Sequence, residues 1–248
     1  MATHNYLLRR NEGTKKNFWC LFAIVAIFIS LLASCSGIEY AAPPTAPHPL
    51  LISITPALGW IVDDLHRCAV ETPEIALIVN EAPASGLDFE SAEAYLRLGS
   101  PPEAPPHFAT LLGYESIVII AHPGISPSQL EIIDVKIHYT SLDAEYQTWE
   151  YPPGNELRTI FDAVVLQGEA PSPQTKIAPN PTAMLEAIAS NPGSVGYSST
   201  HWLQPDVQSV APGAAYADAL RPPILALTTS EPQGATRQFL ACLQNNLP

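Results

Sequence analysis

The chain has 248 residues, of which 47% are hydrophobic and 14% charged, a composition typical of globular proteins. Its 24 acidic residues outnumber the 11 basic ones, and the formal net charge at pH 7 is −13. A surface this acidic repels nucleic acid and anionic lipid, which disfavours a polyanionic partner.

The first 34 residues have the pattern of an export signal. Four basic residues between positions 9 and 16 precede an apolar run at 18–33, which is long for a signal and short for a membrane span. The run ends in the letters LASC, where Cys35 resembles the lipid-accepting cysteine of a bacterial lipobox. The alternative is an uncleaved anchor with an incidental cysteine. Both interpretations place the remaining chain outside the cytoplasm, on a membrane surface.

Removal of residues 1–34 would leave 7 basic and 23 acidic residues, and so a formal charge of −16. Acidity of this kind also serves simply to keep an exported protein soluble. Residues 35–46 are rich in proline and alanine and show no hydrophobic period. They are interpreted as a semi-extended tether between the membrane and the folded part.

Two cysteines remain after the signal and the lipidated Cys35 are set aside. Cys68 and Cys242 would both lie in an oxidising compartment, which favours a disulfide, although two separate buried thiols remain possible. There is no CxxC motif and no His/Cys cluster in the sequence, so no metal or cofactor is expected.

Along the rest of the chain, segments with the hydrophobic pattern of strands alternate with segments that have the pattern of helices. Short apolar runs predict strands at 50–54, 74–80, 92–98, 114–122, 145–151, 194–198 and 224–229. Segments with apolar residues three or four apart predict helices at 55–68, 129–138, 155–166, 181–190 and 233–244. Strands alternating with helices indicate α/β architecture with largely parallel sheets.

Four segments, in order, resemble those of one protein family. They are VIIAHPGISPSQ (118–129), PGNELRTIF (153–161), MLEAIASNPGSVGY (184–197) and RPPILALTTSEPQGATRQFLACL (221–243). This series is similar to the hinge strand, ligand loop, NPGAIGY turn and closing helix of phosphate-type solute-binding proteins of ABC transporters.

The resemblance implies an α/β, type II periplasmic-binding-protein-like fold with two lobes and a ligand cleft between them. Each lobe would be a mainly parallel sheet flanked by helices. Lobe one would comprise 47–118 plus 205–248, and lobe two 119–204. Cys68 and Cys242 would then lie on helices of the same lobe, which supports the proposed disulfide.

The family holds oxyanions with loop amides at helix N-termini, Ser/Thr hydroxyls and usually an arginine. The resemblance assigns these roles here to Thr55, Ser85, Ser100, Gly154, Asn155 and Arg158.

The ligand loop departs from the family pattern. Where that pattern reads Gly-Ser-Gly-Thr, this chain has Gly154-Asn155-Glu156-Leu157, and the upstream arginine position holds Tyr151. A carboxylate in the cleft would oppose a bound anion. Glu156 would instead be favourable if it pointed outward and complemented its own helix dipole, with Asn155 as the N-cap.

The other assigned residues also have structural alternatives. Thr55 suits a helix N-cap followed by Pro56 at the first helical position, and Ser85 and Ser100 suit turns. Arg158 is equally suited to a structural ion pair.

The sequence contains no GxSxG elbow and no phosphate-binding P-loop, so no enzymatic activity is expected. The resulting prediction is a lipid-anchored extracytoplasmic solute-binding protein of the cell membrane. It would bind a small molecule or oxyanion and partner an ABC permease of the phosphate/oxyanion type. The alternative is a sensing or interaction lipoprotein that reuses the two-lobe scaffold.

Overall fold

The structure, a computed structural model, describes residues 46–83, 92–100, 108–126 and 130–247. These residues belong to one compact unit that begins at Ala46. The predicted export signal, Cys35, nearly all of the tether and Ser85 lie outside the described residues.

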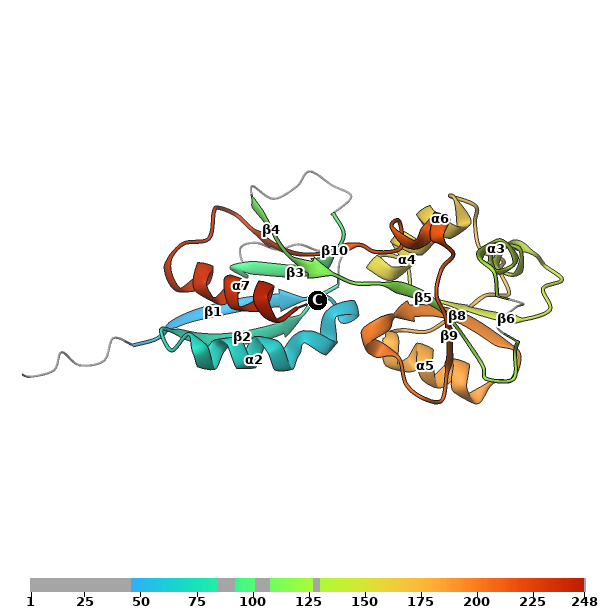
Figure 1. Cartoon of the computed structure of the whole chain (residues 1–248), viewed down its shortest axis with the longest axis horizontal. Coiled ribbons are helices and arrows are strands. Elements are labelled where there is room, and N and C mark those ends of the chain that lie inside the picture. Colours follow the sequence, from blue (N-terminus) through green and yellow to red (C-terminus); the bar gives the residue numbers. More distant parts are fainter. Residues whose placement is uncertain (1–45, 84–91, 101–107, 127–129, 248) are drawn as a thin grey trace, which may run out of the picture. The chain divides into compact units, whose positions relative to one another are not determined.

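The first sheet has the strand order β2-β1-β3-β10-β4 (Figure 1). Its strands are β1 (His48–Ile54), β2 (Ile75–Glu81), β3 (Ala94–Leu98), β4 (Phe108–Tyr114) and β10 (Pro223–Thr228). Strand β1 is parallel to β2 and β3, whereas β10 is antiparallel to both β3 and β4. The sheet therefore takes one of its inner strands from the last part of the chain.

Two helices pack together beside the first sheet: α2 (Val62–Glu71), which continues the 3-10 helix η1 (Pro56–Ile61), and α7 (Gly234–Asn246). A disulfide joins Cys68 of α2 to Cys242 of α7, with the two Cα atoms 5.7 Å apart. Helices α2 and α7 are thereby tied covalently across 174 positions of sequence.

The second sheet has the order β7-β6-β8-β5-β9. Its strands are β5 (Ile117–Ala121), β6 (Gln147–Glu150), β7 (Lys176–Ile177), β8 (Ser194–Ser199) and β9 (Gln208–Val210). Its helices are α3 (Ile132–Thr140), α4 (Glu156–Phe161), which runs on into a π-helical turn at Asp162–Leu166, α5 (Pro181–Ser190) and α6 (Ala214–Ala217).

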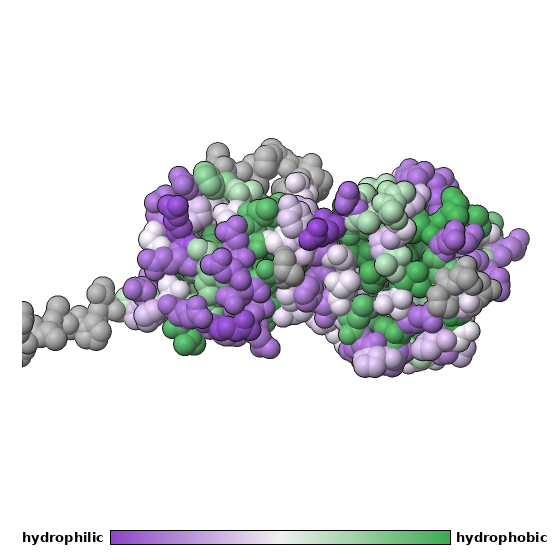
Figure 2. Space-filling model, viewed as in Figure 1, coloured by the Kyte–Doolittle hydropathy of each residue, from purple (hydrophilic) through white to green (hydrophobic). Residues whose placement is uncertain are grey.

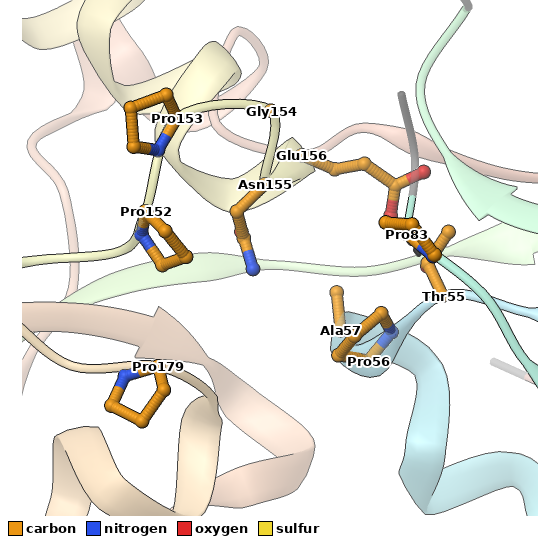
Figure 3. A pocket seen from close by; sticks show the side chains of 10 residues that line it. All are labelled: Thr55, Pro56, Ala57, Pro83, Pro152, Pro153, Gly154, Asn155, Glu156 and Pro179. Atoms are coloured by element: carbon orange, nitrogen blue, oxygen red, sulfur yellow. Dashed lines mark hydrogen bonds between the residues drawn. The ribbon is translucent and has the colours of Figure 1, made fainter. Parts of the chain in front are cut away.

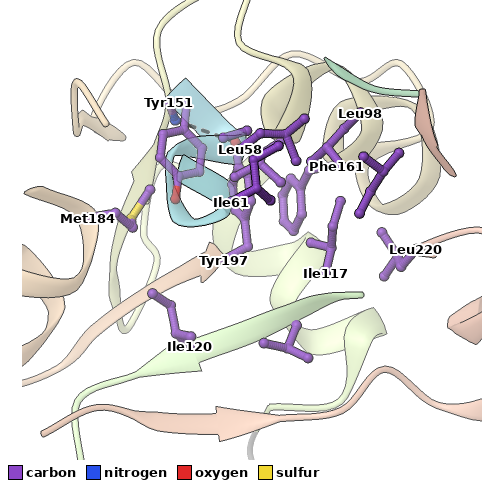
Figure 4. Close-up of a cluster of buried hydrophobic side chains, with 14 of the residues drawn as sticks. Leu58, Ile61, Leu98, Ile117, Ile120, Tyr151, Phe161, Met184, Tyr197 and Leu220 are labelled. Carbon is purple, nitrogen blue, oxygen red and sulfur yellow. Dashed lines mark hydrogen bonds between the residues drawn. The ribbon is translucent and has the colours of Figure 1, made fainter. Parts of the chain in front are cut away.

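Strand β8 shows how the helices cover both faces of the second sheet. Tyr197 stacks on Phe161 of α4 (Figure 4), with ring centroids 3.8 Å apart, and it also contacts Tyr139 of α3. Its neighbour Gly196 faces the other way, where an added Cβ would lie 2.8 Å from the sulfur of Met184 in α5. Because successive residues of a strand face opposite sides, α3 and α4 cover one face and α5 the other.

The chain crosses between the sheets twice, and the two crossing segments are hydrogen-bonded to each other. The amide of Ile117 donates to the carbonyl of Leu220 at 2.8 Å, and that of Glu115 donates to Pro222 at 3.0 Å. The prediction of two α/β sheets flanked by helices is confirmed, although each sheet is mixed because β10 and β5 reverse direction.

Two boundaries differ from the prediction. The expected strand at 114–122 is divided: Tyr114 ends β4, Ile117 begins β5, and the crossing lies between them. Lobe two was expected to end at 204, but β9 pairs with β5 through Ile119 and Val210, so the return crossing follows residue 210. Three-residue strands such as β9 carry too little periodicity to be detected from sequence.

Candidate functional site

A pocket of about 180 Å³ lies where loops of the two sheets meet (Figure 3). Its walls come from the segments that follow β1 and β2 and from those that precede α4 and α5. The lining residues are Thr55, Pro56, Ala57, Pro83, Pro152, Pro153, Gly154, Asn155, Glu156 and Pro179. Half of them are prolines, whose fixed φ angles make these walls stiff and largely apolar.

The turn before α4 explains why Gly154 is glycine. The amide of Asn155 donates to the carbonyl of Pro152 at 3.1 Å, and Gly154 has a φ of +86°. This is the geometry of a type II turn, with Pro153 at its second position and a positive φ at its third. Gly154 is thus required by the backbone, and the turn sets the start of α4 at the pocket.

Asn155 is the N-cap of α4. Its Oδ1 accepts a hydrogen bond from the amide of Leu157 at 2.9 Å, as the capping alternative expected. In Figure 3 the side chain extends into the pocket with its nitrogen at the tip. Capping therefore uses the oxygen of Asn155 and leaves the NH₂ group facing the pocket.

Glu156 does not point outward, so the dipole-only alternative is wrong. The residue is 3% exposed, and its side chain extends toward Thr55 (Figure 3). Thr55 Oγ1 donates to Glu156 Oε2 at 2.6 Å, while Arg97 Nε lies 3.2 Å from Oε1. The pocket-side carboxylate is thus held by residues of the first sheet although it belongs to a helix on the second.

Burial dominates the electrostatics of this carboxylate. Desolvation raises the pKa of Glu156 to about 7, against the opposing effects of the Thr55 hydroxyl, the Arg97 charge and a hydrogen bond from the Leu98 backbone. Burial also lowers the pKa of Arg97, which the charge of Glu156 partly offsets.

Sequence reasoning missed Arg97. It is 4% exposed on β3, a strand with the sequence AYLRL in which every residue is buried. An arginine in the middle of such a strand was the available signal, because an isolated charge is rarely buried without a partner. Within the described part of the chain, its Nη1 has no hydrogen-bond partner.

Thr55 occupies the N-cap position of η1, with Pro56 following, but its side chain makes no capping hydrogen bond. The hydroxyl is used by Glu156 instead. The structure therefore brings Thr55, Gly154 and Asn155 together at one pocket.

Arg158 and Ser100 are not in this pocket. Arg158 Nη1 lies 3.1 Å from Glu150 Oε1 and donates to the Tyr151 carbonyl at 2.9 Å, and its Nε pairs with Asp162. Its role is structural. Ser100 is exposed and is not among the pocket-lining residues.

A second buried carboxylate lies at the crossing between the sheets. Glu115, 1% exposed, accepts hydrogen bonds from the amides of Ser116 and Thr200 and from the Thr200 hydroxyl, and it also bonds His201 Nδ1. His201 in turn stacks on Trp60 of η1. This cluster fixes η1, and with it the start of the pocket wall, against the end of β8.

Among the described residues no group of three or more His, Cys, Asp or Glu side chains is arranged to hold a metal ion. The helices described in the structure are all too short or too polar to cross a membrane.

No protein-family model matches the chain, and no curated protein sequence matches it. Several solved structures, in contrast, are similar to the chain. A phosphate-type ABC transporter substrate-binding protein from Clostridium perfringens, with phosphate bound, has a TM-score of 0.66 at 15% identity, covering 79% of this chain and 93% of its own. An ABC-type phosphate transport receptor from Vibrio cholerae has a TM-score of 0.58 at 17% identity, with the same coverage.

The regulatory domain of Synechocystis CcmR, in complex with 2-PG, is similar at a TM-score of 0.63 and 13% identity, over 80% of this chain and 97% of that domain. Transport receptors and regulatory domains therefore share this architecture. The chain has the type II periplasmic-binding-protein-like fold: two mixed sheets flanked by helices.

Proposed function

We propose that the chain is an exported solute-binding protein that takes a small solute into the pocket around Thr55, Gly154 and Asn155 and delivers it to an ABC permease. The observation that carries the proposal is the pocket itself, whose walls belong to loops of both sheets. An occupant would contact both halves at once, which is how hinge-closing receptors couple binding to a change of shape. The likeness to two phosphate-transport receptors supports it.

The chemistry of the walls favours an uncharged solute over a free oxyanion. Thr55 and Arg97, the donors that would suit an anion, are already engaged by Glu156. Five proline rings and the Ala57 methyl make an apolar surface, and the Asn155 NH₂ offers a donor. The proposed ligand is a small neutral molecule with a hydrogen-bond acceptor, bound without a cofactor and without catalysis.

The test uses the full chain, purified in detergent, against a panel of sugars, amides, amino acids and oxyanions. Binding is read by thermal shift and by intrinsic tryptophan fluorescence. The matched variant is Asn155→Asp, because aspartate also caps a helix but replaces the NH₂ donor with an acceptor. We expect a neutral solute to stabilise the natural chain and the variant to lose that response. If no solute stabilises the natural chain at high excess, the proposal is wrong.

The membrane location is part of the proposal and is tested separately. Lipid attachment at Cys35 would hold the protein on the extracytoplasmic face of the cell membrane, with residues 35–46 as the tether. Cys35→Ala should move the protein from the membrane fraction to the soluble exported fraction. Retention of the variant in the membrane would favour an uncleaved anchor.

A sensing or interaction lipoprotein is the second candidate. The buried contact of Glu156 with Thr55 and Arg97 joins elements of the two sheets directly, side chain to side chain, a property suited to a fixed scaffold. The similarity to a regulatory domain also fits this role. Neighbouring genes discriminate the two: a permease and an ATPase favour transport, whereas a sensor kinase favours sensing.

A further inference from the structure

Three donors of different kinds converge on one carboxylate. Glu156 Oε2 accepts a hydrogen bond from the Thr55 hydroxyl at 2.6 Å, Arg97 Nε lies 3.2 Å from Oε1 as an ion-pair partner, and the Leu98 backbone also hydrogen-bonds to the carboxylate. Hydroxyl, guanidinium and amide groups are the donors with which proteins hold carboxylate, phosphate or sulfate. The surroundings of Glu156 thus have the chemistry of an oxyanion site.

The donors and the acceptor come from opposite sides of the pocket. Thr55 follows β1, and Arg97 and Leu98 belong to β3, so all three donors are attached to the first sheet. The carboxylate enters from α4, on the second sheet. The first sheet alone thus supplies all the donors of the site, and the Glu156 side chain enters the site from the second sheet.

Arg97 has more capacity to donate than Glu156 uses. The residue is 4% exposed, and among the described residues neither its Nε nor its Nη1 has a partner of hydrogen-bond geometry. A buried guanidinium usually makes paired, parallel hydrogen bonds to a planar or tetrahedral oxyanion. The ion pair with Glu156 balances the charge of Arg97 but leaves part of its hydrogen-bonding capacity unused.

We propose that Glu156 is a built-in ligand: its carboxylate occupies an oxyanion site formed by Thr55, Arg97 and the Leu98 backbone, and so excludes free oxyanions from the natural chain. Glu156 is then a specificity-determining residue of the pocket. The inference rests on the proposed function in placing this site at the solute pocket, which Glu156 also lines. That pocket gives an external anion a way in once the side chain is shortened.

The experiment compares Glu156→Ala with Glu156→Gln in the full chain, with sodium sulfate and with sodium chloride of equal ionic strength. Alanine removes the side chain beyond Cβ and opens the site, whereas glutamine removes the charge but still fills the space. We expect sulfate to raise the melting temperature of the alanine variant by about 5 °C or more at roughly a hundredfold excess over Kd. The natural chain and Glu156→Gln should show no difference between the two salts.

Two further variants locate the effect. Adding Arg97→Met to Glu156→Ala should abolish the sulfate response, because the guanidinium is its main anchor. Glu150→Ala is the matched control: it too removes a buried carboxylate paired with an arginine, but Arg158 keeps Asp162 and the Tyr151 carbonyl. It should gain no response. An equal response in the control, or one that survives loss of Arg97, contradicts the inference.

If Glu156→Ala is unfolded in chloride, circular dichroism is recorded in sulfate as well. Recovery of the folded spectrum in sulfate alone supports the inference, and an unfolded spectrum in both salts overturns it. A folded alanine variant without any sulfate response also overturns it and leaves Glu156 as a structural ion-pair partner. The proposed function fails on a different measurement, the response of the natural chain to neutral solutes, so the two failures are distinguishable.

Discussion

The imidazole of His201 and the indole of Trp60 lie face to face, with ring centroids 3.7 Å apart and an angle of 5° between their planes. Trp60 belongs to η1 beside the first sheet, and His201 follows β8 of the second. The stack therefore depends on whatever holds His201, which is the buried carboxylate of Glu115. Nearby, the indole of Trp202 donates to the Ala57 carbonyl at 2.9 Å, a second contact between the same elements.

Glu115→Gln should destabilise the protein by about 2–4 kcal/mol. The amide would place an NH₂ among groups that now donate to the carboxylate, leaving buried donors without acceptors. Urea unfolding measures the change. Glu93→Gln is the control, because Glu93 also pairs with a histidine, His48, but at an exposed position. A change below about 0.5 kcal/mol is expected there, and equal effects of the two substitutions would contradict the role given to Glu115.

The stability of the chain should fall as pH rises from about 4.5 to about 7, through the ionisation of Glu156. Its pKa is raised to about 7 in the folded protein, so in this window the folded state binds more protons than the unfolded state. The contribution is fully present below the unfolded pKa and lost above the folded one, at most about 3 kcal/mol. Thermal unfolding across this range, repeated with Glu156→Gln, measures it. A decline that persists undiminished in the glutamine variant must have another origin.

Gly154→Ala should cost about 1–3 kcal/mol, because alanine is strained at a φ of +86°. Gly154→Asn should cost less, since asparagine tolerates the left-handed region better. Chemical denaturation gives both values. If the two substitutions are equally mild, the turn before α4 is more adaptable than its geometry indicates.

Reduction of the Cys68–Cys242 bond should lower the stability by up to about 5 kcal/mol, as expected for a crosslink that closes 174 positions of chain. The comparison is the melting temperature with and without reductant. A Cys68→Ser/Cys242→Ser variant should melt at the lower temperature under both conditions. If the natural chain melts at the same temperature with and without reductant, the bond adds nothing to stability.

Sequence reasoning succeeded where local chemistry decides the structure. Pro181 after Asn180 marks the start of α5, and Asn191-Pro192 its end, so this helix was placed at 181–190 as observed. The N-cap alternative for Asn155, weighed beside its assignment to the ligand loop, rests on the same grounds and describes the observed cap. Both features are set by hydrogen bonds and backbone restrictions within a few residues.

What the sequence did not disclose depends on distant partners. Glu156 is in the first turn of a helix, where an outward orientation is equally favourable; its inward orientation depends on Thr55, a hundred and one positions away, and on Arg97. The sequence places Arg97 in a strand but gives no sign of its partner, because Glu156 belongs to a distant helix on the second sheet. Strand β4 was missed since Phe108–Tyr114 is an edge strand with a mixed pattern of exposure.

The place of β10 between β3 and β4 has a consequence for how the protein is made. β3 and β4 do not pair with each other, so each lacks a neighbour on that side until residues 223–228 have been synthesised. The strands of the second sheet all lie earlier, between residues 117 and 210, and can pair first. As the chain emerges during synthesis, the first sheet would therefore be the last to be completed, and a chain truncated before residue 223 would expose two unpaired strand edges to aggregation.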